Sequence, residues 1–113
     1  MCIMTSGEEE KIRRFLTDPK SAAIKAMLEK DHAIDCIFLL YMKRGKWKEA
    51  KTFMNENGLT LSDGTFRARM IEIADLGLAK PVPIDPLKKY YVITDFGEKV
   101  AEFFLKFFDE LRV

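Results

Sequence analysis

Apolar residues recur at i, i+3 and i+4 spacing over the first half of the chain, which predicts a succession of helices. Two short amphipathic helices are expected, one over 8–16 and a second that begins near Ser21. The segment 31–43 is apolar on nearly all sides, as is typical of the central helix of a core. A further helix is predicted over 46–57, where Asn57-Gly58 is the stop signal.

The next predicted helix, 62–76, has a narrow apolar stripe. Ser62 is a strong candidate for its N-cap, and Gly77 for the residue that ends it. The apolar positions at helical spacing are Phe66, Met70 and Ile73. Because this stripe covers only part of the helix surface, the opposite face is free to contact something else.

After this helix the period changes to that of strands. Strands are expected over 80–84 and 88–94, joined by Asp85-Pro86-Leu87, since Asp followed by Pro favours a tight turn. A final helix is predicted over 95–111, with a wide and mostly aromatic stripe. This stripe consists of Val100, Phe103, Phe104, Phe107, Phe108 and Leu111. The expected fold is therefore mainly α with a small β-hairpin.

Composition limits the class of protein. The 113 residues, 48% of them apolar and 33% charged, are typical of one compact domain. No run approaches the roughly 20 apolar residues of a membrane span, and residues 1–10 hold no apolar stretch of signal-peptide length. We therefore expect a cytoplasmic protein without membrane contact.

Charge is distributed unevenly, although the chain as a whole carries only +1. Residues 43–94 hold ten basic and six acidic side chains, a net charge of +4, whereas 1–42 and 95–113 carry −1 and −2. A basic centre is typical of a nucleic-acid surface, because phosphate contacts supply most non-specific affinity. Solvated helix faces have similar compositions. The densest basic cluster is Lys43, Arg44, Lys46 and Lys48.

The sequence offers little for catalysis. His32 is the single histidine, and nothing completes a triad around it. Gly58 and Gly64 do not lie in a phosphate-binding loop. Cys2 and Cys36 lack the partners of a metal motif, and the apolar surroundings of Cys36 favour a buried thiol. We therefore expect no enzyme, no cofactor and no bound metal.

Two segments resemble a known superfamily. Residues 62–78, from Ser62 to the pair Gly77-Leu78, resemble the recognition helix of winged helix-turn-helix transcriptional regulators. The segment Tyr91-Val92-Ile93-Thr94-Asp95-Phe96-Gly97 is similar to the second wing strand and the Leu-Thr-x-x-Gly turn of the multiple-antibiotic-resistance and phenolic-acid regulator families. The resemblance covers roughly residues 33–108.

This resemblance implies a single winged-helix domain with N-terminal helices over 1–30, a helix-turn-helix and wing over 31–94, and a dimerisation helix over 95–113. It also implies a small dimeric regulator of transcription that binds double-stranded DNA. The helix 62–76 would read the major groove, and the wing 80–94 would contact the flanking backbone. Some winged helices bind only proteins, so a protein-contact module in a transcription or chromatin assembly is the alternative.

The resemblance places DNA contacts on the reading helix, on the wing and at the start of the preceding helix. The residues are Ser62, Asp63, Thr65, Arg67, Ala68, Arg69, Lys46, Lys48, Lys88 and Lys89. Arg67 projects away from the apolar stripe and can bind guanine or phosphate, or remain solvated. Arg69 can reach a phosphate or pair with an acidic neighbour. Thr65 can contact DNA or only support the cap, and Lys88 and Lys89 can contact DNA or serve solubility.

The aromatic stripe of the final helix exceeds the width that one core face needs, which favours a subunit interface. In the resembling families this helix and the N-terminal helices form a two-fold dimer, so a homodimer is expected. The resemblance also implies a small-molecule effector. Two departures from the family pattern, Ile71 and the acidic trio Asp63, Glu72 and Asp75, favour modest DNA affinity or a face covered by a partner.

Overall fold

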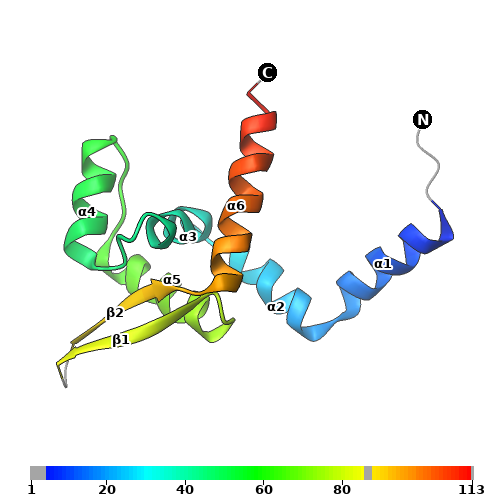
Figure 1. Cartoon of the computed structure of the whole chain (residues 1–113), viewed down its shortest axis with the longest axis horizontal. Coiled ribbons are helices and arrows are strands. Elements are labelled where there is room, and N and C mark those ends of the chain that lie inside the picture. The colour runs from blue at the N-terminus through cyan, green and yellow to red at the C-terminus, as the bar shows by residue number, and fades with distance from the viewer. Residues whose placement is uncertain (1–4, 86–87, 113) are drawn as a thin grey trace.

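The computed structural model describes residues 5–85 and 88–112, and within them the chain is mainly helical with a small antiparallel hairpin (Figure 1). This confirms the expected mixture of elements. The predicted turn residues 86–87 and Cys2 lie outside the described residues. The elements are α1 Ser6–Thr17, α2 Pro19–Leu28, α3 Ala33–Tyr41, α4 Trp47–Glu56, α5 Asp63–Asp75, β1 Ala79–Asp85, β2 Lys88–Ile93 and α6 Asp95–Glu110.

The first two helices meet at Asp18. Its carboxylate accepts a hydrogen bond from the backbone N–H of Ser21 at 2.8 Å and caps α2, while Pro19 occupies the first turn. Backbone and side-chain hydrogen bonds from Ser21 hold the pKa of the Asp18 carboxyl below its usual value. The expectation that α2 begins near Ser21 was therefore wrong, because the better N-cap lies three residues earlier.

Helix α3 is the centre of the core, as its all-round apolar pattern predicts. It packs against α2, α5, α6 and β2. Its buried residues are Ala33, Cys36, Ile37, Leu39 and Leu40. The helix is shorter than the expected 31–43, because His32 and Lys43 both adopt the left-handed conformation, with φ of 63° and 64°. A left-handed residue at each end interrupts the helical hydrogen-bond ladder.

The cap and stop predicted for α5 are confirmed. The Ser62 hydroxyl accepts the Thr65 N–H at 3.1 Å, and Gly77 ends the segment with a φ of 83°. The predicted apolar stripe of Phe66, Met70 and Ile73 is buried. At the start of α4 the ring of Trp47 packs on Phe66, with 5.2 Å between centroids, which fixes α4 against the first turns of α5.

Strands β1 and β2 pair from Ala79 opposite Ile93 outward to Asp85 opposite Lys88. Strand β2 ends one residue before the predicted Thr94, because Thr94 caps α6 instead of continuing the ladder. The hairpin passes close to the turn between α3 and α4. A Cβ at Gly45 would overlap the carbonyl oxygen of Tyr91, so only glycine allows this approach.

Thr94 joins α5, the hairpin and α6. Its hydroxyl donates to the carbonyl oxygen of Gly77 at 2.6 Å and accepts the Gly97 N–H at 3.1 Å, while its own N–H donates to Leu78 O at 3.0 Å. A Cβ at Gly97 would overlap the Leu78 carbonyl oxygen. The spacing Thr-x-x-Gly is thus a structural requirement of this junction.

Removing the Thr94 hydroxyl is expected to weaken the junction. Thr94→Val keeps the shape of the side chain but leaves the Gly97 N–H and the Gly77 carbonyl without that partner, at an expected cost of about 2 kcal/mol in the free energy of unfolding. Urea unfolding followed by circular dichroism measures this loss. Thr94→Ser, which keeps the hydroxyl, should lose less than half as much, and equal losses would contradict a role for the hydrogen bonds.

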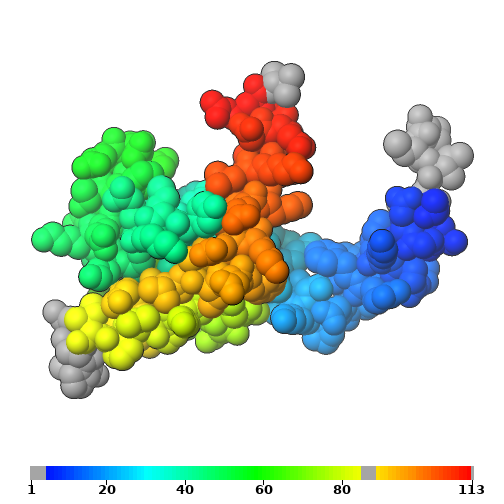
Figure 2. Space-filling model, in the orientation of Figure 1, coloured from blue at the N-terminus to red at the C-terminus, as the bar shows by residue number. Residues whose placement is uncertain are grey.

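Two helices extend beyond the core. Helix α1 has no buried residue, and in α6 only Gly97 and Ala101, in its first two turns, are buried. Figures 1 and 2 show α1 and the C-terminal half of α6 as separate projections with open space between them. The radius of gyration is 16.2 Å, whereas a compact chain of this length has about 13 Å. The projections therefore enlarge the exposed apolar surface.

Candidate nucleic-acid interface

The face of α5 opposite its buried stripe is open to solvent. Positions 64, 67, 71 and 75 are spaced by three or four residues and therefore share one side of the helix, and all of them are exposed. The side chain of Arg67 is 74% exposed. Ala68, beside it, is half-buried. A helix with one free face and a cation in its N-terminal half has the shape and charge needed to enter a DNA groove.

Arg67 is held by an acidic neighbour on its own helix. Its Nε donates to Asp63 Oδ1 at 3.0 Å, one turn earlier. Both side chains are exposed, and exposed pairs of this kind contribute about 0–1 kcal/mol. The contact of Arg67 with Asp63 is therefore weak. A phosphate or a guanine edge can replace Asp63 as the partner of the guanidinium at little cost in free energy.

The N-terminal end of α5 is occupied by its own cap. Besides accepting the Thr65 N–H, the Ser62 hydroxyl donates to Thr65 Oγ1 at 2.9 Å. Of the two roles expected for Thr65, support of the cap is the one this geometry favours. Ser62 itself is exposed at the start of the helix.

Arg69 has a different environment from Arg67. Its side chain is only 14% exposed, and Nη1 lies 3.2 Å from Glu72 Oε2. The same carboxylate oxygen is 3.1 Å from Nζ of Lys30, which follows the C-cap of α2. Arg69 therefore takes the second of its two expected roles, pairing with an acidic neighbour, and it links α5 to α2.

The basic cluster before α4 divides into two pairs. Lys43 Nζ lies 3.7 Å from Glu98 Oε1 of α6, and the Arg44 guanidinium lies over the Phe53 ring at 5.0 Å. Lys46 and Lys48 are exposed at the start of α4. Lys46 Nζ is 5.1 Å from the centre of the Tyr90 ring on β2, so Lys46 lies where the start of α4 meets the hairpin.

On the hairpin, Lys89 is exposed, with Nζ 6.0 Å from the ring of Tyr91. The backbone of Lys88 pairs in β2, but its side chain is outside the described part of the structure. Because Trp47 contacts Phe66 and Lys46 contacts Tyr90, the start of α4, the first turns of α5 and β2 are neighbours. The structure thus brings Lys46 beside Tyr90 of the hairpin and Trp47 onto the buried side of α5 at Phe66, whereas Arg67 shares the free face of α5 with Asp75 and Arg69 is largely buried.

The aromatic stripe of α6 is a second exposed surface. Phe103 is 64% exposed, and Phe107, Phe108 and Leu111 are also exposed, whereas Phe104 is half-buried. The phenylalanines pack on one another, for example Phe104 on Phe108 with 6.1 Å between centroids. Val100, one of the residues predicted to lie at the dimer interface, packs against the core of its own chain instead. Among the residues that the structure describes, most of the stripe is exposed.

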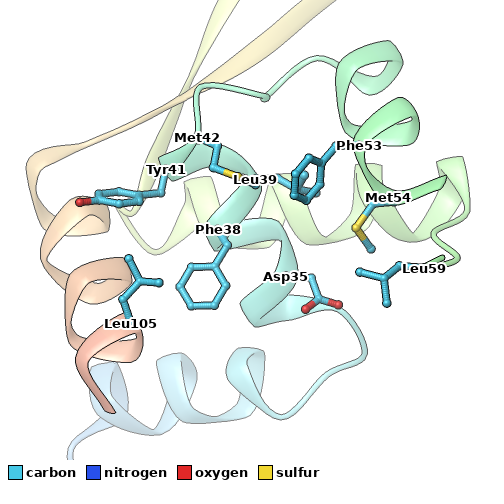
Figure 3. Close-up of a pocket in the computed structure, with 9 residues that line it drawn as sticks. All are labelled: Asp35, Phe38, Leu39, Tyr41, Met42, Phe53, Met54, Leu59 and Leu105. Carbon is cyan, nitrogen blue, oxygen red and sulfur yellow. The ribbon is translucent and has the colours of Figure 1, made fainter. Parts of the chain in front are cut away.

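An apolar pocket of about 450 Å³ lies between α3, α4 and α6 (Figure 3). Phe38 points into its centre from α3, Leu105 closes one side from α6, and Met54 lies at the other. Asp35 is the single charged residue among those that line it, and its carboxylate oxygen is 2.9 Å from His32 Nδ1. Sequence reasoning missed this pocket, because its walls come from three separate segments.

Cys36 is not available for chemistry. It is fully buried in α3, and this burial, together with the nearby Asp35 carboxylate, raises the pKa of its thiol to about 12. A thiol with that pKa stays protonated near neutral pH and is a poor nucleophile. The expectation of a buried thiol is confirmed.

Comparison of the chain with family models, with curated proteins and with solved structures finds no match. Over the described ranges, 5–85 and 88–112, none of the helices combines the length and the apolar character needed to cross a membrane.

Proposed function

We propose that this chain is a winged helix-turn-helix protein that binds double-stranded DNA as a small dimeric transcriptional regulator, with α5 as its reading helix. The observation that carries the proposal is the free face of α5. The solvent-facing guanidinium of Arg67 lies in its N-terminal half, with Asp75 on the same face, and the exposed cations Lys46 and Lys48 lie at the start of α4, which packs on the buried side of α5 through Trp47 and Phe66. Cations around a free helix supply the phosphate contacts that position such a helix on DNA.

The order of elements supports the winged-helix part of the proposal. Helices α3, α4 and α5 are followed by the hairpin β1–β2 and then by α6. In this arrangement α4 crosses the DNA backbone, α5 enters the major groove and the hairpin contacts the adjacent backbone or minor groove. Of the two predicted wing lysines, Lys89 is the one whose side chain the structure describes, and it is exposed. Arg69 is not part of the proposed contact set, because its guanidinium is paired with Glu72.

The projecting helices support the dimer. Over residues 5–85 and 88–112, exposed apolar side chains gather on α1 (Ile12, Phe15, Leu16) and along α6 to its C-cap (Phe103, Phe107, Leu111). Association of two copies along these helices would remove them from water, with a gain of about 25 cal/mol per Å² of apolar area. Two reading helices in one dimer would also raise affinity for a two-part site.

The pocket beside α6 favours an effector as a further partner. Its apolar walls and the one carboxylate of Asp35 suit an apolar small molecule, with a volume in the range of ligand sites. Because the pocket contacts both α4 and α6, a ligand there would act on the angle between the dimerisation helix and the helix-turn-helix. The protein is proposed to act in the cytoplasm, where chromosomal DNA is accessible in a prokaryotic cell.

A salt titration of binding to mixed-sequence duplex tests the DNA proposal. The dissociation constant is expected to rise more than about ten-fold between about 50 and 200 mM salt, because phosphate contacts release counterions. Arg67→Glu should weaken binding a further 10- to 100-fold, roughly the effect of losing one strong contact and adding a repelling charge. Fluorescence anisotropy measures both.

Lys106→Glu is the matched control, since it introduces the same charge on the polar side of α6, away from α5. It should leave affinity within about two-fold. Absence of binding at low salt, or binding without salt dependence, would contradict DNA binding and favour the protein-contact module. Equal losses for Arg67→Glu and Lys106→Glu would contradict the choice of α5 as the reading helix.

A further inference from the structure

The pocket between α3, α4 and α6 has a single charged group in its wall. Its volume of about 450 Å³ falls within the range of small-molecule sites. Asp35 is the one charged residue among the nine that line it, and three of the others are aromatic: Phe38, Tyr41 and Phe53. The charge of a ligand is therefore a property that this wall can select.

Asp35 and Phe38 form one wall of the pocket. They are three residues apart on α3, a spacing that places two side chains on the same side of a helix, and both line the pocket (Figure 3). The Asp35 side chain is 46% exposed, so the carboxylate lies at the opening and not at the bottom. A carboxylate in that position stays hydrated in part and avoids the cost of full burial.

The contacts of Asp35 leave its charge available to a ligand. Its Oδ2 lies 2.9 Å from His32 Nδ1, and within the described residues Oδ1 accepts no hydrogen bond. A neutral imidazole that donates from Nδ1 orients the carboxylate but does not cancel its charge. The cation nearest to the aromatic wall, Arg44, lies over the Phe53 ring at 5.0 Å and is not a lining residue. The charge that the pocket wall presents is therefore negative.

An ammonium group fits this wall better than a neutral or an acidic group. It forms a charge-assisted hydrogen bond with a carboxylate, and it is attracted by the face of an aromatic ring. A ligand carboxylate would be repelled by Asp35, and a neutral ligand would gain only the apolar contacts. The remaining walls, such as Met54 and Leu105, favour an apolar body, because they remove its surface from water.

We propose that the pocket binds an apolar molecule that carries an ammonium group, with the ammonium at Asp35, beside Phe38, and the apolar part between Met54 and Leu105. This inference rests on the proposed function, in which the pocket takes an effector, and it deepens that function by naming the chemical class of the effector. Asp35 is the residue that selects the charge of the ligand.

Three probes with one carbon skeleton test the selection of charge. Each is a naphthalene ring on a propyl chain that ends in an amine, an alcohol or a carboxylate. Isothermal titration calorimetry with the full-length chain, without DNA, measures their dissociation constants. Wild type should bind the amine about five- to ten-fold more tightly than the alcohol, and the carboxylate more weakly than either. Asp35→Asn, which keeps the size of the side chain, should bind the amine and the alcohol equally.

The control is Asp75→Asn, which removes the same charge from an exposed position at the end of α5, outside the pocket. It should keep the amine preference of wild type. Circular dichroism should show both variants folded, since both side chains are partly or fully exposed and asparagine has the shape of aspartate. The readout is the ratio of amine to alcohol affinity, so a general change in affinity does not affect it.

The results separate this proposal from the proposed function. Loss of the amine preference in Asp35→Asn, but not in Asp75→Asn, supports the proposal. Equal binding of the three probes, a preference for the alcohol or the carboxylate, or an amine preference that persists in Asp35→Asn overturns it. Binding of no probe also overturns it, as expected if a second copy of the chain covers the pocket. All of these results leave salt-dependent DNA binding in place, whereas amine binding by a chain that binds no DNA would overturn the regulator alone.

Discussion

Replacing Gly97 with alanine is expected to remove more than about 3 kcal/mol from the free energy of unfolding. The new Cβ would overlap the Leu78 carbonyl oxygen and lie 2.6 Å from Ile93 Cγ1. The carbonyl cannot easily turn aside, because it accepts the Thr94 N–H at 3.0 Å. Helix α6 must therefore shift away from the core. Thermal unfolding should show a midpoint lowered by roughly 10 °C or more.

Gly64→Ala is the matched control for this prediction. Gly64 lies in the first turn of α5, where an added Cβ meets nothing within 4 Å. The same substitution there should leave stability unchanged or raise it by up to about 1 kcal/mol, because alanine restricts the unfolded chain and favours the helix. Equal midpoints for Gly97→Ala and wild type would show that α6 does not begin against Leu78.

The second large effect is expected on oligomeric state. Phe103→Glu combined with Phe107→Glu should convert a dimer to a monomer, because two carboxylates would have to be buried without partners in the proposed interface. Both phenylalanines are exposed in one chain, so the fold should remain intact. Light scattering coupled to size exclusion measures the mass, and circular dichroism checks the helix content.

Lys106→Glu again serves as the control, because it changes the net charge by the same −2 on the same helix but on its polar side. It should leave the mass unchanged. A wild-type chain that is monomeric at about 100 μM would contradict the proposed dimer. A dimer that survives both phenylalanine substitutions would mean that another surface, such as the apolar side of α1, holds it together.

Local signals in the sequence predicted the elements well. Ser62 and Gly77 bound α5 because capping is a short-range interaction, and the buried stripe of α5 follows from helical periodicity alone. Where two short-range signals compete, the sequence is ambiguous. Asp18 and Ser21 are both acceptable caps, and the hydrogen bond from Ser21 to Asp18 decides in favour of the first.

Long-range contacts could not be predicted from the pattern. Arg67 and Arg69 are two residues apart on one helix and carry the same charge, yet one is solvent-facing and the other pairs with Glu72 and packs inward. Nothing in the linear sequence connects Lys30, just after α2, to that pair. The pocket beside Leu105 depends in the same way on how three helices pack.

The hydrogen bonds of Thr94 have a mechanical consequence. They tie the end of α5, at Gly77, to the first turn of α6. Because one side chain bonds both helix ends, a rotation of α6 is expected to rotate α5 with it. In the proposed dimer, the contact between two α6 helices would then fix the separation of the two α5 helices, and hence the spacing of the half-sites on the operator. Changes in the α6 contact would alter operator spacing while leaving base preference untouched.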